Sequence, residues 1–323
     1  MKPYKFVTLS DKVERTEPRE RNVLLEYHFH GKWLLKGKAL TDIIIRSGEL
    51  DIHEDNIVHD LMKRNGQPFL PGSSVKGVVR SIHEAITYSC IDLPYLFGEN
   101  YNRNQEYEAI SSDNCKDDAI CPTCQLFGYV NRGSIGKSLL AFSDFRLTTD
   151  VEESVTVKKI PNLFRPLREK SAMTIYQDER DRLQRKFYTH GTPQAGSGSP
   201  QLVIKKGAEF QGEITYFNLD GKDIGALAFS FGIAENPFPI KIGYGKPAYF
   251  GSIQFELENV IPYETFLFQS RKLTMEEVLE KAENYGTDDA FISGQKERLR
   301  EIFDFEANKH NHWGVNQYGR KGY

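Results

Sequence analysis

Apolar and polar residues alternate in four short segments of the chain. This period of two is typical of half-buried strands. The four predicted strands cover residues 22–30, 139–147, 209–217 and 253–257. After the first of them, apolar positions recur every three to four residues, which predicts a helix from Ser73 to about Tyr88. A second helix is expected at 224–231, capped by Asp223 and ended by Gly232.

The resulting order is strand, helix, strand, strand, helix, strand. It predicts an α+β fold with a ferredoxin-like βαββαβ core, the scaffold also found in RRM-like RNA-recognition modules. We expect this core to fill residues 1–258. Long insertions would interrupt it at 31–70, 89–138 and 148–208, the first being mostly loop with a short strand near residues 43–45.

Residues 259–323 are expected to form a helical extension. Thr274 and Glu277 have the spacing of a capping box, which predicts a helix through about Asn284. A second helix is predicted at 294–308, with Leu299 and Ile302 on one face.

Charge and hydropathy limit the possible partners. The 323 residues carry a net charge of −3, which argues against a solitary, tight nucleic-acid binder but permits a local basic groove. No stretch of about 18 apolar residues occurs, so we expect no membrane partner. The N-terminus lacks the apolar segment of a signal peptide, so we expect a cytoplasmic location.

All four cysteines lie in or beside the 89–138 insertion. Cys121-Pro-Thr-Cys124 has a spacing that lets two thiolates meet one tetrahedral zinc ion. Cys115 and Cys90 complete a set of four ligands, and His83 is the alternative to Cys90. A redox Cys-x-x-Cys is the competing interpretation, but the expected thioredoxin-like context is missing. We predict a structural zinc site without a catalytic role.

The segment Pro68-Phe-Leu-Pro-Gly-Ser-Ser-Val-Lys-Gly-Val-Val-Arg80 predicts a turn followed by a helix start. Ser73 or Ser74 can cap this helix. Its free N–H groups, together with Lys76 and Arg80, suit an oxyanion such as phosphate. The alternative is an ordinary capped helix with solvated charges.

A second glycine-rich segment runs from residue 241 to 252. Gly243 and Gly245 allow a close backbone approach, and Lys246 supplies a cation. The frame is not that of a Walker loop, so this segment alone is weak support for phosphate binding.

The 148–208 insertion carries a local positive charge. Between residues 158 and 190, nine Lys and Arg residues stand against four Asp and Glu residues, and aromatic residues are interleaved. Basic residues beside aromatic rings suit single-stranded nucleic acid. The alternative is a solvated arm.

Residues 49–60 are acidic and include His53 and His59. Such a loop could perform acid–base chemistry or bind a divalent cation. The alternative is an ordinary solvated loop.

Together these segments resemble the RAMP superfamily of CRISPR proteins, and in particular the backbone subunits of type III effector complexes. The resemblance rests on Pro71-Gly-Ser-Ser-Val-Lys-Gly-Val-Val-Arg80, Cys121-Pro-Thr-Cys-Gln-Leu-Phe-Gly128, Arg185-Lys-Phe-Tyr-Thr-His190 and Gly243-Tyr-Gly-Lys-Pro-Ala-Tyr-Phe-Gly251. It implies a zinc-bearing insertion, a hairpin-like arm and a role in antiviral defence. The implied partners are a guide RNA, a target RNA and other effector-complex subunits. The residues then expected to contact RNA are Gly72, Ser73, Ser74, Lys76, Arg80, Arg185, Lys186, Gly243, Gly245 and Lys246.

The resemblance also implies a possible endoribonuclease activity on target RNA. Related subunits use an aspartate in the loop before the Pro-Gly-Ser-Ser segment, and counting back from Pro71 points to Glu54 or Asp55. The acid would align or deprotonate a ribose 2′-OH, with a divalent ion such as Mg²⁺ as a candidate cofactor. The family's run of small residues before the aspartate is replaced here by Glu-Leu-Asp-Ile-His.

Two other functions remain open at this point. One is a guide-processing endoribonuclease of the same superfamily, for which His83 would be the catalytic candidate. The other is a zinc-stabilised protein-interaction module.

Overall fold

The largest element of the fold is an eight-stranded, curled antiparallel sheet. The computed structural model describes residues 2–53, 56–91, 110–131, 133–163, 176–265 and 268–312. The sheet has the order β15-β16-β2-β14-β10-β6-β5, and β9 also pairs with β14. Its strands are β2 Phe29–Ala39, β5 Lys63–Arg64, β6 Gln67–Leu70, β9 Leu140–Phe142, β10 Phe145–Leu147, β14 Glu209–Leu219, β15 Ile240–Lys241 and β16 Ser252–Pro262.

Strand β2 shows why the sheet has one buried and one solvated face. Trp33 and Leu35 are fully buried, and the lysines alternate with them along the strand. On the solvated face, Lys32 pairs with Glu213 of β14 at 2.9 Å. Because side chains alternate strictly in a strand, this pattern fixes which face receives the helices.

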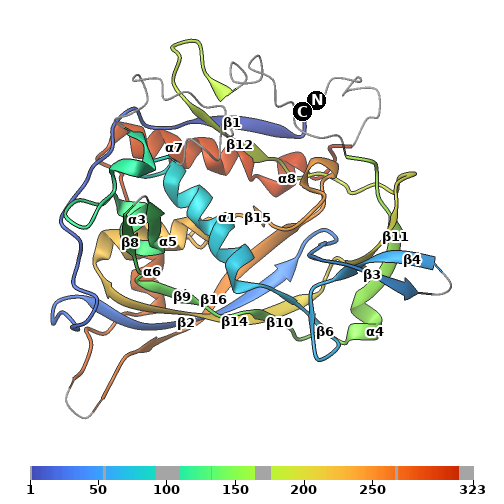
Figure 1. The fold of residues 1–323 in the computed structure, drawn as a ribbon, viewed down its shortest axis with the longest axis horizontal. Helices are drawn as coiled ribbons and strands as arrows, with labels where there is room; N and C mark the ends of the chain where they lie inside the picture. Colours follow the sequence, from blue (N-terminus) through green and yellow to red (C-terminus); the bar gives the residue numbers. More distant parts are fainter. Residues whose placement is uncertain are drawn as a thin grey trace.

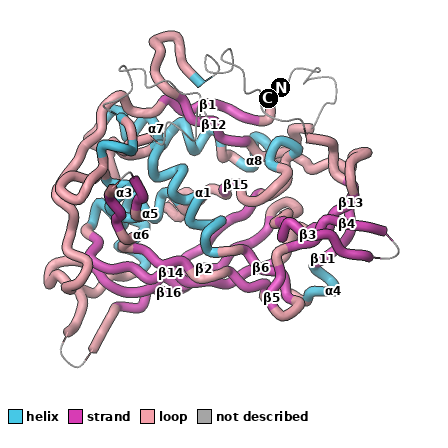
Figure 2. The backbone as a smooth tube through the Cα atoms, viewed as in Figure 1, coloured by secondary structure: helices cyan, strands magenta, loops and turns pink. Residues whose placement is uncertain are grey.

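Helices cover the buried face of the sheet (Figures 1 and 2). Helix α1, Gly72–Ala85, confirms the first predicted helix and buries Val75, Val79 and Ile82. In α5, Gly221–Ser230, the N-cap is Asp220, and Asp223 is the third helical residue of a capping box. The predicted cap at Asp223 was therefore wrong by one turn.

The C-terminal helices lie on the same side of the sheet. They are α6 Met275–Asn284, α7 Ala290–Ile302 and α8 Phe305–Asn308. The capping box of Thr274 and Glu277 opens α6 as predicted. The single helix predicted at 294–308 is divided into α7 and α8, because Asp304 caps a new helix start. Figure 1 shows α1 between the sheet and α7.

Smaller elements surround this core. β1 Tyr4–Thr8 pairs with β12 Gln184–Tyr188, and β7 Tyr129–Asn131 pairs with β8 Ser134–Gly136. A four-stranded sheet has the order β11-β13-β4-β3, formed by β3 Arg46–His53, β4 Asn56–Leu61, β11 Val155–Lys159 and β13 Pro200–Ile204. The short helices are α3 Pro122–Phe127 and α4 Val151–Ser154, with 3-10 turns η2 Ser112–Asn114 and η4 Lys246–Ala248.

Two further sequence expectations were wrong. The strand predicted at 22–30 begins only at Phe29; Val23 and Tyr27 are 59% and 84% exposed. Residues 31–70 are not mostly loop, since they hold β2 to β6. Within the 148–208 arm, β11 and β13 pair antiparallel, which agrees with the hairpin-like arm, while β12 between them pairs with the N-terminal strand β1.

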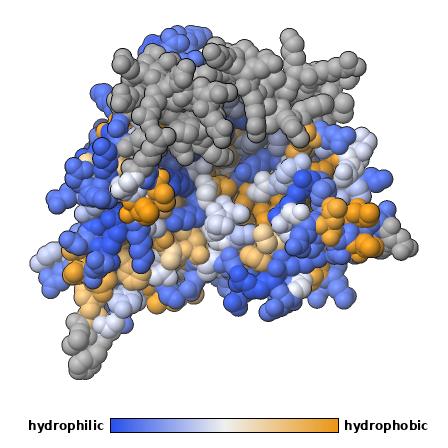
Figure 3. Space-filling view, viewed as in Figure 1, coloured by the Kyte–Doolittle hydropathy of each residue, from blue (hydrophilic) through white to orange (hydrophobic). Residues whose placement is uncertain are grey.

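Two hairpins expose apolar side chains. On β3 and β4, Leu50, Ile52 and Ile57 are 63%, 73% and 66% exposed, and Figure 3 shows apolar surface over this hairpin. On β7 and β8, Val130 and Ile135 are cross-strand partners and both are exposed. Exposed apolar patches of this kind often mark protein contact surfaces.

Candidate metal centre and nucleic-acid interface

The short helix α3 positions two of the four cysteines. Cys121 is its N-cap residue, and its Sγ accepts a hydrogen bond from the backbone N–H of Cys124 at 3.4 Å. Pro122 suits the first helical position, where a backbone N–H would have no partner inside the helix. Cys90 comes from the segment after α1, and Cys115 directly follows the turn η2.

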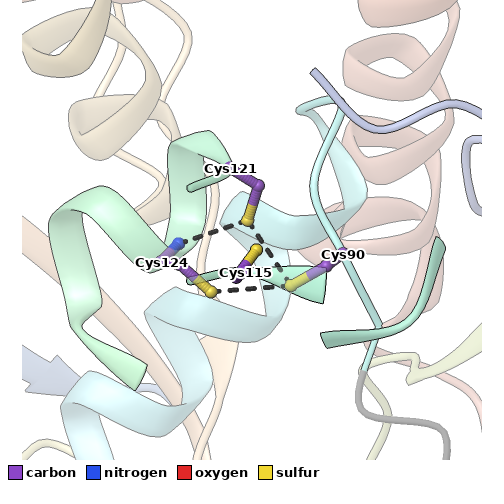
Figure 4. A group of neighbouring side chains, drawn as sticks. All are labelled: Cys90, Cys115, Cys121 and Cys124. Atoms are coloured by element: carbon purple, nitrogen blue, oxygen red, sulfur yellow. Dashed lines mark hydrogen bonds between the residues drawn. The ribbon is translucent and has the colours of Figure 1, made fainter. Parts of the chain in front are cut away.

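The four thiols form one buried group (Figure 4). Their sulfur atoms all lie within 4.8 Å of one another, and Cys90 Sγ is 3.5 Å from the sulfur atoms of Cys121 and Cys124. All four cysteines are free of disulfide bonds. A tetrahedral zinc ion with bonds of about 2.3 Å to sulfur holds its ligands roughly 3.8 Å apart. The donor set therefore fits a zinc ion enclosed by four thiolates.

Electrostatics within the group also favour a cation. The hydrogen bond with Cys115 raises the pKa of the Cys90 thiol, whereas the hydrogen bond with Cys121 lowers the pKa of the Cys115 thiol. One thiolate is thus stabilised by protonated neighbours. Four thiolates at these distances require a positive charge among them, which zinc would supply.

His83 is not a member of the metal-binding group. Its Nδ1 lies 2.7 Å from Thr123 Oγ1, and burial lowers the pKa of its imidazole to about 3. It is 1% exposed. A histidine that is buried and neutral in this way does not fit the catalytic role expected for a guide-processing endoribonuclease.

The cysteines belong to a small apolar cluster separate from the main core. Ile120 and Tyr129 pack with the four cysteines, and Val13 contacts them from the N-terminal segment. Leu126 and Phe127 join the same insertion to the main core, so a metal at its centre would add folding free energy to the part around the cysteines.

The N-terminus of α1 differs from the prediction. The N-cap is Pro71, and neither Ser73 nor Ser74 makes a side-chain cap. The N–H of Gly72 instead donates to Asp144 Oδ1 at 2.9 Å. Ser73 is exposed and Ser74 is half-buried. One of the free N–H groups predicted to face a phosphate is therefore already bonded to a carboxylate of the protein.

A cavity of about 640 Å³ lies between α1 and the cysteine insertion. Lys76, Arg80 and Arg185 line it. The carboxylate of Glu84 pairs with both arginines. Its Oε1 lies 2.9 Å from Arg80 Nε, and its Oε2 lies 2.5 Å from Arg185 Nη1. Burial lowers the pKa of Lys76, and the charge of Arg80 lowers it further.

A second cavity, of about 310 Å³, lies on the neighbouring side of α1. Its basic lining residues are Arg185, Lys186, Lys241 and Lys246. Ser81 and Arg185 line both cavities, so the two adjoin along the helix. Lys76 and Lys246 thus face adjoining cavities, although they come from distant parts of the sequence.

The glycines of the late loop have a structural explanation. A Cβ at Gly243 would lie 2.4 Å from the backbone oxygen of Ile44, and one at Gly245 would meet Phe250 at 3.2 Å. Both glycines also have positive φ angles, of 80° and 78°. The protein's own backbone and side chains take up this space, so their contact with RNA stays a prediction.

The acidic segment 49–60 is a hairpin rather than a loop. Its strands are β3 and β4, and Glu54 and Asp55, the candidate catalytic acids, lie outside the described residues. Asp60 and Asp51 lie 2.7 Å and 3.7 Å from Lys63 Nζ. These two carboxylates are partly neutralised by one lysine.

The fold is a mixed α+β structure in which a buried group of four cysteines that could hold a metal lies beside two adjoining cavities lined by basic residues. The sequence model of the RAMP superfamily matches residues 36–306, so the chain belongs to the RAMP superfamily. This superfamily is associated with proteins that bind and process CRISPR RNA and act in multisubunit complexes. No curated protein sequence matches the chain. Every helix in the described ranges is too short or too polar to cross a lipid bilayer.

Three residues of the candidate interface were not predicted from the sequence. Glu84 could have been found, because it lies four residues after Arg80 on the same helix face. Asp144 and Lys241 carried no such signal, since their positions depend on tertiary contacts with α1 and with the second cavity.

Proposed function

We propose that this chain is a CRISPR RNA-binding subunit of a type III effector complex, which holds the guide RNA backbone along helix α1. The observation that carries the proposal is the pair of adjoining cationic cavities that share Ser81 and Arg185. Basic side chains gathered beside α1 from several elements suit a phosphate backbone and require no net positive charge on the whole chain.

The arrangement of the main sheet supports a ferredoxin-like core for this subunit. The antiparallel order β16-β2-β14-β10, with α1 and α5 on one face, agrees with the βαββαβ order of that fold. The zinc-bearing insertion would then be a structural addition beside the RNA, with the cysteines kept reduced in the cytoplasm.

Assembly with other subunits is supported by the two apolar hairpins. Leu50, Ile52 and Ile57 on β3 and β4, and Val130 and Ile135 on β7 and β8, expose apolar surface that a neighbouring chain would cover. Purification from the native host is expected to yield RNA of discrete length together with sister subunits. Recovery of the chain without RNA would contradict the proposal.

RNA binding can be tested by removing single charges from each cavity. Lys76→Gln and Lys246→Gln are each expected to weaken single-stranded RNA binding roughly tenfold, since one charge-assisted contact contributes about 1.5–3 kcal/mol. Lys38→Gln, on the solvated face of β2, is the matched control and should leave affinity unchanged. Fluorescence anisotropy at fixed salt measures the RNA affinity of each variant. Equal affinities for all three variants would refute the interface.

Cleavage of target RNA by Glu54 or Asp55, with Mg²⁺ as the candidate cofactor, is a separate part of the proposal. Asp55→Ala should abolish target cutting while guide binding is retained. Cutting at the wild-type rate would exclude Asp55, and the same test then applies to Glu54.

A further inference from the structure

Three lysines of the smaller cavity form no ion pair with any carboxylate of the described residues. Lys186, Lys241 and Lys246 come from β12, β15 and η4. Within the described ranges, none of the three forms an ion pair with Asp or Glu, whereas Arg185 of the same cavity is paired with Glu84. Buried cations without counter-charges are costly, so an external anion is the expected partner.

Lys241 is the most deeply placed of the three, at 4% exposed. Its Nζ donates to the backbone oxygen of Tyr249 at 2.9 Å and to Ser252 Oγ at 3.1 Å. An ammonium group has three donors, so one N–H is left for a ligand in the cavity that Lys241 lines.

The hydrogen bonds behind Lys241 supply no negative charge. Ser252 Oγ, which accepts from Lys241, lies 2.9 Å from His190 Nδ1 and can donate to it. His190 Nε2 lies 3.2 Å from the backbone oxygen of Pro239. This series of hydrogen bonds runs from an ammonium group through a hydroxyl and a neutral imidazole to a carbonyl, and no acid of the described residues compensates the charge of Lys241.

Lys186 is held by aromatic rings instead of an acid. Its Nζ lies 4.9 Å from the ring centroid of Tyr4, 5.3 Å from that of Tyr188 and 5.9 Å from that of Tyr176. Cation–π contacts orient an ammonium group without cancelling its charge. Lys186 is thus positioned at the cavity and still able to attract an anion.

We propose that this cavity binds one phosphate group carried on a single nucleotide, with Lys241 and Lys246 as its main cationic contacts and Lys186 as a third. The cavity's 310 Å³ lies at the small end of the range of about 300–1,000 Å³ for ligand pockets, which suits one nucleotide. Burial lowers the pKa of Lys241 and of Lys246, and a bound anion would offset that effect. The inference deepens the proposed RNA function and rests on it for the source of the nucleotide.

Calorimetric titration of the zinc-loaded full chain with AMP and with adenosine tests the site. AMP is expected to bind at least tenfold more tightly than adenosine. Lys241→Met and Lys246→Met should each lower the AMP affinity at least tenfold. Lys38→Met should leave the AMP affinity unchanged. Equal binding of AMP and adenosine, or unchanged AMP affinity in both cavity variants, would overturn the proposal. Lys246 is half-buried, so its variant remains informative if Lys241→Met does not fold.

RNA oligonucleotides then identify the source of the phosphate. Tighter binding of 5′-phosphorylated than of 5′-hydroxyl RNA supports a site for an RNA end. If the two RNAs bind with equal affinity, and Lys241→Met weakens both to the same extent, the site accepts an internal phosphodiester. AMP binding without any RNA binding would leave the site standing and refute the RNA function. RNA binding that survives in a chain unable to bind AMP would refute the site alone.

Discussion

Glu84 joins two structural elements through two arginines. Its carboxylate lies 2.9 Å from Arg80 on the same helix and 2.5 Å from Arg185 on β12. The side chain of Glu84 is 11% exposed, and those of Arg185 and Arg80 are 16% and 33% exposed. We predict that Glu84→Gln destabilises the fold and strengthens RNA binding.

The expected loss of stability follows from this burial. Removing one partner of a buried pair costs about 3–5 kcal/mol, because the remaining charge stays buried without compensation. Arg80 is partly solvated and glutamine can still accept a hydrogen bond, so the expected loss is at the lower end, about 3 kcal/mol. RNA affinity should rise about fivefold, since one negative charge near the phosphates is worth about 1 kcal/mol at a solvated site.

Urea unfolding and RNA anisotropy measure the two effects on the same protein. Glu213→Gln is the matched control, because it breaks the exposed pair with Lys32 on the far face of the sheet. That variant should lose less than about 1 kcal/mol and leave RNA affinity unchanged. Equal stability losses in the two variants would refute the argument from burial. Weaker RNA binding in Glu84→Gln would refute the placement of the phosphates beside the two arginines.

Three further predictions concern the rest of the fold. One equivalent of zinc should copurify with the chain, and Cys121→Ser should lose it and lower the unfolding midpoint by about 10 °C or more; a metal-free wild type would contradict this. Asp220→Ala should lower the free energy of unfolding in urea by about 1–2 kcal/mol, because Asp220 caps α5 and also pairs with Arg19. Thr274→Ala, which removes only the cap of α6, should lower it by about 1 kcal/mol, and equal losses would contradict the added role of Asp220. Burial holds the pKa of His190 well below its usual value, so the folded state takes up the proton less readily than the unfolded state. Wild type should then lose about 1 kcal/mol more than His190→Gln between roughly pH 6.5 and 5.5, and parallel pH profiles would contradict this.

The candidate metal centre could be predicted because its chemistry is local. A Cys-x-x-Cys pair needs only a cysteine N-cap and a proline at the first helical position to bring two sulfur atoms together. The other two cysteines had few alternative partners. The ambiguity with His83 was resolved by tertiary contact alone, since Thr123 holds the imidazole outside the sulfur group.

The first strand could not be placed correctly by alternation alone. Residues 22–30 alternate as well as β2 does, but Val23 and Tyr27 are exposed. The strand that enters the core contains Trp33 and Leu35, flanked by lysines whose partners are glutamates of β14. A lysine-rich stretch with glycines has low intrinsic strand propensity, and the cross-strand ion pairs that it makes are invisible in the sequence.

The smaller cavity shows why a candidate binding site can escape motif analysis even when its residues are noted. Lys246 was singled out for the glycines beside it, yet Gly243 and Gly245 are explained by contacts within the chain. What makes Lys246 a candidate phosphate contact is its proximity to Lys241 and Lys186, which come from different strands. Phosphate affinity depends on how many uncompensated cations converge, and convergence is a property of the tertiary structure. The sequence could indicate an anion as the ligand, but only the fold shows which lysines have no acidic partner in the described part of the chain.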